Sequence, residues 1–350
     1  MTFPPITRRS ATTGLLVLLV ALAGLVAYKS AGAVRVWHRV RSTGTLAVRE
    51  DVIPLGLGDP LPVFWQVLNY LTVVWPALVF GILIAGAVRA FVPPARLAEL
   101  FDGAPVRSHV AAGLFGSPLM LCSCCVAPVF SAVYGRSSRL GPSLAVMLAA
   151  PALNPAALIL TFTLFSATIA WSRLLMSVAA VFVGTALVAR FCSNRIAPAP
   201  GPVTSGSTNE ADAGSNPISG RSVITLLFSS CVHVTVRTVP LIIVGVAIGM
   251  LLSNYFPAAA LTPSAAAVAV AVTAAFAVLI ALPTFFEIPL ALTLLAAGAP
   301  AGTAAALLFA GPAVNLPSLL TVGRSAGWKT AVLLGVMVWL IALVGGAFLG

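Results

Sequence analysis

The chain has 350 residues, of which 60% are hydrophobic and 8% are charged. Soluble domains usually contain about 25% charged residues, so this composition excludes an ordinary water-soluble protein. The formal net charge of +11 does not indicate nucleic-acid binding, because no basic patch alternates with exposed aromatic residues. The 19 Lys and Arg lie mostly between apolar stretches, where they contact lipid headgroups. We therefore predict an all-α, polytopic membrane protein in a lipid bilayer.

The first apolar run extends from Ala11 to Ala27, between the pair Arg8-Arg9 and Lys29. A basic start, an apolar middle and the small residues 31–33 also fit a cleaved signal peptide. Because the run is long enough to cross a bilayer, we expect a retained first helix. Residues 35–63 are basic and then rich in Pro and Gly, which predicts a loop or an interfacial segment.

Eight further apolar stretches bring the prediction to about nine transmembrane helices, with a range of eight to ten. These stretches are Phe64–Arg89, His109–Tyr134, Pro142–Phe165, Thr168–Phe191, Val223–Leu252, Ser264–Leu282, Glu287–Phe309 and Lys329–Leu349. A segment rich in Ser, Pro, Gly and Asn interrupts them and predicts a flexible linker. The predicted organisation is an N-terminal helix and basic loop (1–63), a first membrane unit (64–192), the linker (193–222) and a second membrane unit (223–350).

The two membrane units resemble each other. Residues Trp75–Gly81 match Val239–Gly245 at an offset of 164, and Ala149–Asn154 match Ala310–Asn315 at an offset of 161. Two matched blocks in the same order predict an internal repeat. Repeats of this kind recur in secondary transporters, whose solute site lies between them. Whether the repeats are parallel or inverted stays open at this stage.

Each unit contains two places where Pro and polar residues interrupt an apolar stretch. Proline removes an amide donor and frees a carbonyl, and in hydrocarbon both must be satisfied by protein or water. Paired interruptions therefore predict broken or re-entrant helices that line a solute site, although prolines that only kink packed helices are the alternative. The prolines concerned are Pro118 and Pro128, Pro151 and Pro155, Pro283 and Pro289, and Pro312 and Pro317.

Polar side chains accompany these interruptions. Glu287 is the only acid deep within an apolar stretch, and an unpaired buried carboxylate costs several kcal/mol. We interpret it as a proton- or cation-coupling group, with a protonated structural carboxyl as the alternative. Asn154 and Asn315 occupy matched positions, where they cap helices or contact the solute. His233 and Arg237 read as an interfacial pair, and Arg237 is the only Arg that we place near a pathway.

Three cysteines, Cys122, Cys124 and Cys125, surround Ser123 within four residues. A lone membrane Cys is usually a small hydrophobe, and the other two cysteines fit that description. Three adjacent thiols instead indicate soft-ligand chemistry, with Cu(I) or trivalent arsenic as the species bound. No second Cys or Cys/His pair completes a four-ligand zinc site, so we expect no structural metal. We also expect no cofactor.

The run from Pro118 through Cys122-Ser123-Cys124-Cys125 to Pro128 resembles the Pro-x-Cys-Ser-Cys-x-x-x-Pro signature of a permease family. That family includes the organoarsenical efflux permeases (the ArsP/YraQ group). The Pro-Ala-x-Asn runs at 151–154 and 312–315 resemble it too, and the likeness extends from about Phe64 to the C-terminus. Two departures stand out: two extra residues separate Pro118 from Cys122, and Cys125 stands where Gly or Ser is commoner.

The resemblance implies a multi-pass permease of the bacterial cytoplasmic membrane, not an enzyme. Trivalent methylated or aromatic arsenicals are the best-known solutes of the group, although many members have no assigned substrate. On this reading Cys122 and Cys124, with Cys125 as a third thiol, bind arsenic transiently.

The sequence thus predicts a secondary transporter, since no G-x-x-x-x-G-K-[ST] nucleotide signature is present. The predicted solute site comprises Cys122, Ser123, Cys124, Cys125, Asn154 and Asn315. A permease for a sulfur-containing solute or a soft metal complex is an open alternative. A membrane thiol oxidoreductase would need a second Cys pair, and a scaffold without transport would leave the polar interruptions unexplained.

Overall fold

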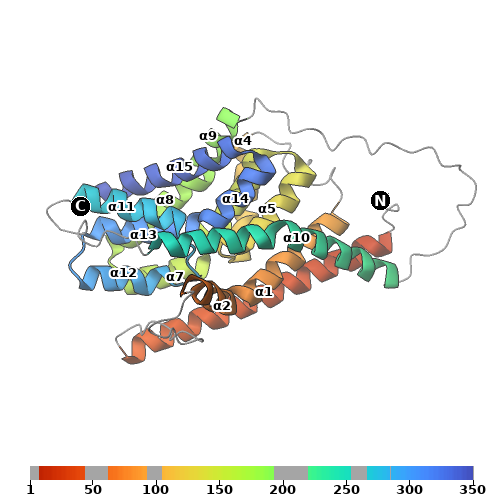
Figure 1. The fold of residues 1–350 in the computed structure, drawn as a ribbon, viewed down its shortest axis with the longest axis horizontal. Helices are drawn as coiled ribbons and strands as arrows, with labels where there is room; N and C mark the ends of the chain where they lie inside the picture. The colour runs from red at the N-terminus through yellow and green to blue at the C-terminus, as the bar shows by residue number, and fades with distance from the viewer. Residues whose placement is uncertain are drawn as a thin grey trace, which may run out of the picture.

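The computed structural model describes residues 8–43, 62–92, 105–192, 220–253, 266–283 and 285–349. Within these ranges the chain forms helices and no strands, which confirms the all-α prediction. The long helices lie side by side along the longest axis of the molecule (Figure 1).

The helices of the first half are α1 (Arg8–Thr43), α2 (Pro62–Phe91), α4 (Pro105–Gly116), the 3₁₀-helix η1 (Ser117–Leu119), α5 (Ser123–Ser137), α6 (Leu140–Ala152), α7 (Pro155–Leu164), α8 (Ala167–Val178), the π-helical η2 (Ala179–Gly184) and α9 (Thr185–Cys192). Those of the second half are α10 (Gly220–Ser253), α11 (Ala266–Leu279), α12 (Glu287–Ala296), α13 (Ala301–Ala313), α14 (Leu316–Ala326) and α15 (Trp328–Ala347).

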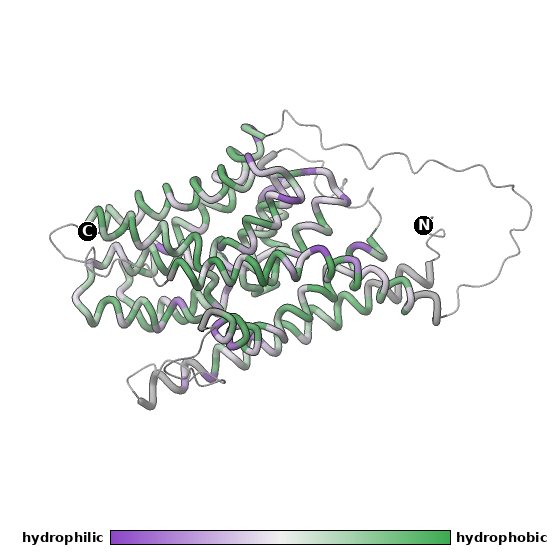
Figure 2. Tube along the Cα trace, in the orientation of Figure 1, coloured by the Kyte–Doolittle hydropathy of each residue, from purple (hydrophilic) through white to green (hydrophobic). Residues whose placement is uncertain are grey.

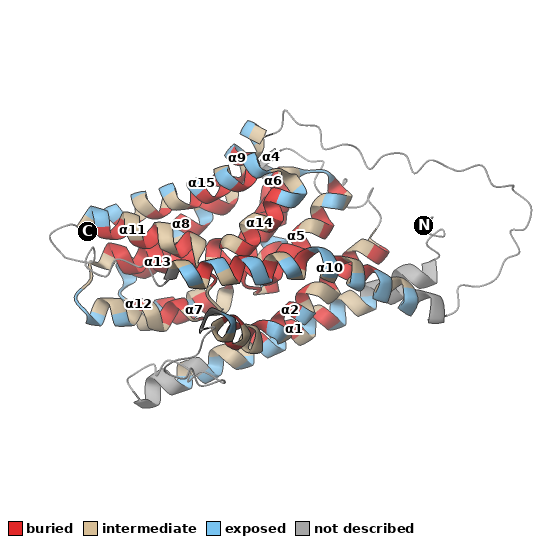
Figure 3. Cartoon of the chain, in the orientation of Figure 1, coloured by how far each residue is buried: buried red, intermediate tan, exposed pale blue. Residues whose placement is uncertain are grey.

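Five of the described helical stretches are long and apolar enough to cross a membrane, and seven are if each of two bent pairs forms one span. The single spans are Leu16–Arg35, Phe64–Phe91, Ala167–Cys192, Ile224–Leu252 and Trp328–Ala347. Apolar residues line these helices over most of their length (Figure 2), and exposed residues follow the outer faces while buried ones fill the centre (Figure 3). Large exposed side chains such as Trp75, Trp171 and Val236 therefore suit a lipid environment rather than water.

Two predicted boundaries differ from the structure. Helix α1 continues to Thr43, where we predicted a loop or an interfacial segment from residue 35, because no Pro or Gly interrupts residues 34–43. The predicted single span Glu287–Phe309 is two helices, α12 and α13, packed against each other. They separate at Gly298, whose φ of 83° only glycine adopts easily, and at Pro300, which caps α13. Most of the predicted linker, residues 193–219, lies outside the described residues.

Four interruptions shape the interior. In the first half α4 gives way to α5 through η1, and α6 meets α7 at a bend of 41°. In the second half α11 gives way to α12, and α13 meets α14 at a bend of 45°. We call these four places the breaks, and α5, α7, α12 and α14 each begin at one of them.

Two long helices touch the breaks through glycine. A Cβ at Gly81 of α2 would overlap the carbonyl oxygen of Cys125 in the first turn of α5. A Cβ at Gly245 of α10 would lie 2.6 Å from the backbone nitrogen of Pro317 in the first turn of α14. Small residues are what allow such close helix approach in membranes. The two glycines therefore fix α2 and α10 against the first turns of two broken helices.

Candidate functional site

The cysteine run lies at the break that precedes α5. Pro118 is the second residue of η1, Met120 follows η1 with a left-handed φ of 49°, and Cys122 is extended at φ −72° and ψ 161°. The carbonyl of Cys122 accepts hydrogen bonds from the amides of Cys125 and Val126, both at 3.0 Å. Cys122 is thus the N-terminal cap residue of α5, and its neighbours occupy the first turn.

The three thiols form one buried cluster. The Sγ atom of Cys122 lies 3.2 Å from that of Cys124 and 2.6 Å from that of Cys125, and the last two are 3.7 Å apart. The hydroxyl of Tyr70, on α2, lies 3.1 Å from Cys124 Sγ. Cys124 and Cys125 have no exposed surface, and all three are free thiols. The cluster can offer two or three sulfur ligands to one soft atom.

Asn154 and Asn315 cap the helices that begin at the two bent breaks. Asn154 Oδ1 accepts from the amides of Ala156 at 3.0 Å and Ala157 at 3.4 Å. Asn315 and Ser318 form a reciprocal capping box, in which Asn315 Oδ1 accepts from the Ser318 amide at 3.1 Å. Both residues therefore cap helices. Each residue still holds a buried Nδ2 group without a hydrogen-bond partner.

A hydrogen bond joins two breaks in the first half. Ser117 Oγ, in η1, donates to the carbonyl oxygen of Leu153 at 2.6 Å, directly before Asn154. The thiol-bearing break and the α6–α7 break thus touch each other. Ser123, the first residue of α5, has a buried hydroxyl without a partner.

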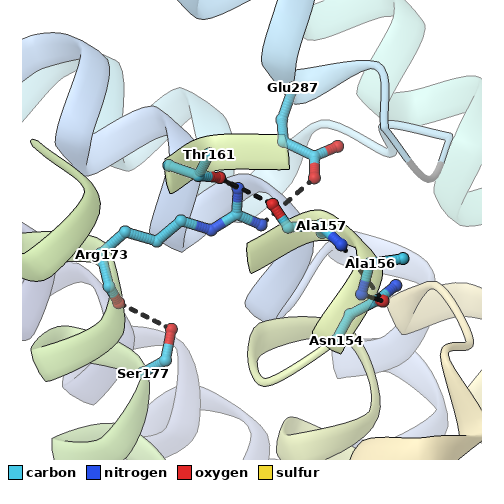
Figure 4. Close-up of polar contacts among 7 residues, drawn as sticks. All are labelled: Asn154, Ala156, Ala157, Thr161, Arg173, Ser177 and Glu287. Carbon is cyan, nitrogen blue, oxygen red and sulfur yellow. Dashed lines mark hydrogen bonds and ion pairs between the residues drawn. The ribbon is translucent and has the colours of Figure 1, made fainter. Parts of the chain in front are cut away.

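A buried ion pair links the two halves (Figure 4). Arg173 of α8 donates from Nη2 to Glu287 Oε1 of α12 at 3.3 Å, and from Nη1 to Thr161 Oγ1 of α7. The side chains of Arg173 and Glu287 are 0% and 2% exposed. The predicted burial of Glu287 is confirmed, and it is paired rather than isolated. Arg173 Nε and Glu287 Oε2 remain without partners.

Sequence reasoning missed Arg173. It lies within the predicted span Thr168–Phe191, and one Arg among that many apolar residues leaves the average hydropathy high. An Arg inside a span was itself the available signal, since such a charge normally faces a partner or a cavity. We expected Arg237 alone among the arginines to lie near a pathway; Arg237 is exposed on α10, whereas Arg173 is fully buried.

A second buried cation, Lys29, lies near both the thiol cluster and the Arg173–Glu287 ion pair. Lys29 of α1 is 7% exposed and acts electrostatically on the Cys122 thiol and on the Glu287 carboxyl. Helix α1 packs against α2, η1 and α7, which brings it beside two of the breaks. The thiol cluster and the ion pair therefore lie within electrostatic range of one ammonium group.

The eight prolines divide into those at breaks and those within helices. Pro118, Pro155, Pro283 and Pro317 lie at breaks or in the first turn after one. Pro289, the third residue of α12, is likewise in the first turn after a break, whereas Pro128, Pro151 and Pro312 lie inside α5, α6 and α13. Pro151 and Pro312 are the second-last residues of their helices, so only Pro128 lies away from a break.

A family model described as a predicted permease, ArsP_1, matches residues 63–350, which cover both halves and every break. The chain belongs to this permease family. The N-terminal helix α1 up to Thr43 lies outside the matched region.

Two relatives are similar to this permease. UPF0718 protein YraQ of Escherichia coli (strain K12) is 29% identical over 278 residues, covering 79% of the chain and 78% of the relative. UPF0718 protein MJ0584 of Methanocaldococcus jannaschii is 26% identical over 121 residues, covering 34% of the chain and 33% of the relative. No solved structure matches. Family and apolar helices together make the chain a multi-pass membrane permease, which suggests a transporter rather than an enzyme.

Proposed function

We propose that this permease is a secondary transporter that exports a small thiophilic solute, such as a trivalent organoarsenical, through a site between its two halves. The observation that carries the proposal is the buried cluster of Cys122, Cys124 and Cys125 at a helix break. A trivalent organoarsenical with two hydroxyl groups reacts with two thiols: two As–S bonds form, two As–O bonds break, and two waters leave. No oxidant or reductant is involved, so the binding step is reversible.

The arrangement of the two halves supports alternating access. The bounds of α6 and α13 differ by 161 residues at both ends, and the starts of α7 and α14 and of α8 and α15 differ by the same number. This number is the offset of the second pair of matched sequence blocks, Ala149–Asn154 and Ala310–Asn315, whereas the first pair has an offset of 164. The pattern favours an internal repeat across the breaks.

Side-chain contacts favour an inverted repeat. Two contacts between the equivalent outer helices show their relative direction. Lys329 Nζ at the start of α15 donates to Phe191 O at the end of α9. Ser172 Oγ near the start of α8 donates to Gly345 O near the end of α15. The equivalent helices therefore run antiparallel, which is the relation expected when one unit is turned over in the membrane.

Glu287 is the proposed coupling group. Its carboxyl lies at the start of α12, holds one oxygen on Arg173 and keeps the other without a partner. A buried carboxylate whose partner changes between two states is suited to exchange a proton or cation with the accessible side.

A soft metal complex is the second candidate, and the third thiol favours it. A dithiol suffices for an organoarsenical, whereas three Sγ atoms that all lie within 4.8 Å of one another suit a soft ion such as Cu(I). In that case the ion is the cargo. A sulfur-containing solute also remains a candidate.

The test is protection of an arsenic-sensitive bacterium that expresses the permease on methylarsenite or phenylarsenite. Cys122→Ser and Cys124→Ser are expected to abolish protection, and Cys231→Ser, a matched control on α10, to retain it. Protection that survives both cluster substitutions would remove the thiols from the mechanism. No protection by a membrane-inserted wild-type protein would exclude arsenicals as the cargo, and Cu(I) salts would then be assayed in the same strain.

A further inference from the structure

Four helix N-termini lie in the interior of this permease. Helices α5, α7, α12 and α14 start at the breaks with Ser123, Pro155, Glu287 and Leu316, and each has at least ten residues. The free N–H groups of a helix N-terminus carry roughly half a positive charge, which favours anions. Each break also holds the C-terminus of the preceding helix, so the amides favour an anion only locally, at the start of α5, α7, α12 or α14.

The buried polar atoms that lack a partner at the breaks are mostly donors. Three can only donate: Asn154 Nδ2, Asn315 Nδ2 and Arg173 Nε. The hydroxyl of Ser123 can donate or accept, Glu287 Oε2 accepts, and each of the five residues is at most 1% exposed. A buried donor without an acceptor costs about 1–3 kcal/mol. The donor set therefore fits a ligand that brings acceptor oxygens.

These donors belong to elements that touch one another. Ser117 joins the α5 and α7 breaks, and Arg173 reaches from α8 to Thr161 on α7 and to Glu287 on α12 (Figure 4). Helix α5 packs against α14, and α6 packs against α13. Hydrogen bonds thus link the α5 and α7 breaks, Arg173 links α7 to the start of α12, and the helix after the fourth break packs against the thiol-bearing α5.

We propose that the solute carries an anionic group beside its thiophilic atom, and that Arg173 binds this group while the cysteine cluster holds the thiophilic atom. The inference rests on the proposed function and narrows its solute class. The anion competes with Glu287 for the guanidinium, because Arg173 is the buried cation that pairs with that carboxylate. An Arg guanidinium suits the role because it forms two parallel hydrogen bonds to a carboxylate or an oxyanion.

The test compares two arsenicals that differ in charge alone. The purified full-length protein in detergent is dialysed against 4-carboxyphenylarsenite or its neutral amide, 4-carbamoylphenylarsenite, and bound arsenic is counted by mass spectrometry. We expect the carboxylate to bind about tenfold more tightly, the effect of one charge-assisted hydrogen-bond pair. The charge-neutral double variant Arg173→Gln/Glu287→Gln is expected to lose this preference and to bind the two probes with equal affinity.

Each outcome decides a different point. Equal affinity of the wild-type protein for the two probes would overturn the anionic solute and leave thiol-dependent transport standing. Binding of neither probe to a monodisperse protein would overturn the proposed function and this inference together. If the double variant does not fold, Arg173→Lys replaces it, because a single ammonium keeps the charge, loses the planar fork, and is expected to reduce the preference severalfold.

Discussion

At the scale of single residues, Arg173 and Glu287 illustrate how a buried charge depends on its partner. Their side chains are almost fully buried, and each is the other's ion-pair partner. Removal of one member leaves a charge in a region of low dielectric constant, whereas removal of both leaves a neutral interior. Stability therefore depends on whether the buried positive and negative charges balance, not on the number of hydrogen bonds.

Arg173→Leu is accordingly expected to lower the free energy of unfolding by about 3–5 kcal/mol. Arg173→Gln/Glu287→Gln is expected to recover most of that loss. Thermal unfolding in detergent measures both, with the exposed Arg237→Ala as a control. A double variant no more stable than Arg173→Leu would show that the pair is not the source of the effect.

Gly81 is a second residue whose replacement has a defined consequence. A side chain there would overlap the Cys125 carbonyl, which is backbone and cannot move aside easily. Gly81→Ala is expected to destabilise the protein by about 1–3 kcal/mol and to weaken arsenical binding. Gly135→Ala is the matched control, since a Cβ at Gly135 would meet nothing within 4 Å. Equal melting temperatures for the two variants would contradict the close approach of α2 to α5.

At the scale of helices, substitutions at the two Asn caps are expected to affect stability and transport differently. Asn315→Ala removes the cap oxygen and is expected to lower stability by about 1 kcal/mol. Asn154→Ser keeps a capping oxygen but lacks the Nδ2 group, so it is expected to unfold like the wild type and to transport less. Growth protection of the expressing cells and melting curves of the protein from the same cells distinguish the two effects. Full transport by Asn154→Ser would confine that amide to capping.

The interior of this site was largely accessible to sequence reasoning, and the helix boundaries were less so. Cysteine clustering, the isolated acid Glu287 and the matched Asn residues stand out because each residue type is unusual in an apolar stretch. Helix boundaries depend on tertiary contacts. The turn at Gly298 and Pro300 divided a predicted span because α12 folds back on α13, and an apolar pattern does not distinguish a hairpin from one long helix.

Arg173 was missed for a related reason. A sliding average treats one Arg in a long apolar stretch as tolerable, although the same residue is the partner that Glu287 requires. The two lie 114 positions apart in the chain, so only the folded structure brings them together. A search of the other apolar stretches for a cation that could pair with Glu287 would have included Arg173.

At the scale of the whole molecule, the proposed inverted repeat predicts a topology. Ser138 follows α5 and Gly298 follows α12, both are exposed, and they occupy nearly equivalent positions in the two halves. Single cysteines at these sites, in a Cys192→Ser/Cys231→Ser background, are expected to react with a membrane-impermeant maleimide from opposite sides of the membrane. Labelling of both from the same side would establish parallel repeats.

Because Cys124 and Cys125 are completely buried, the rate at which they react with a reagent measures opening of the protein. A reagent that cannot enter the closed protein modifies these thiols only during excursions in which the halves separate. When re-closure is faster than alkylation, the observed rate is the product of sulfur reactivity and the fraction of time spent open. A small maleimide added to a Cys192→Ser/Cys231→Ser variant, which lacks the two half-buried thiols, therefore reports the fraction of time that the permease is open. A solute that holds the protein closed slows the reaction in proportion.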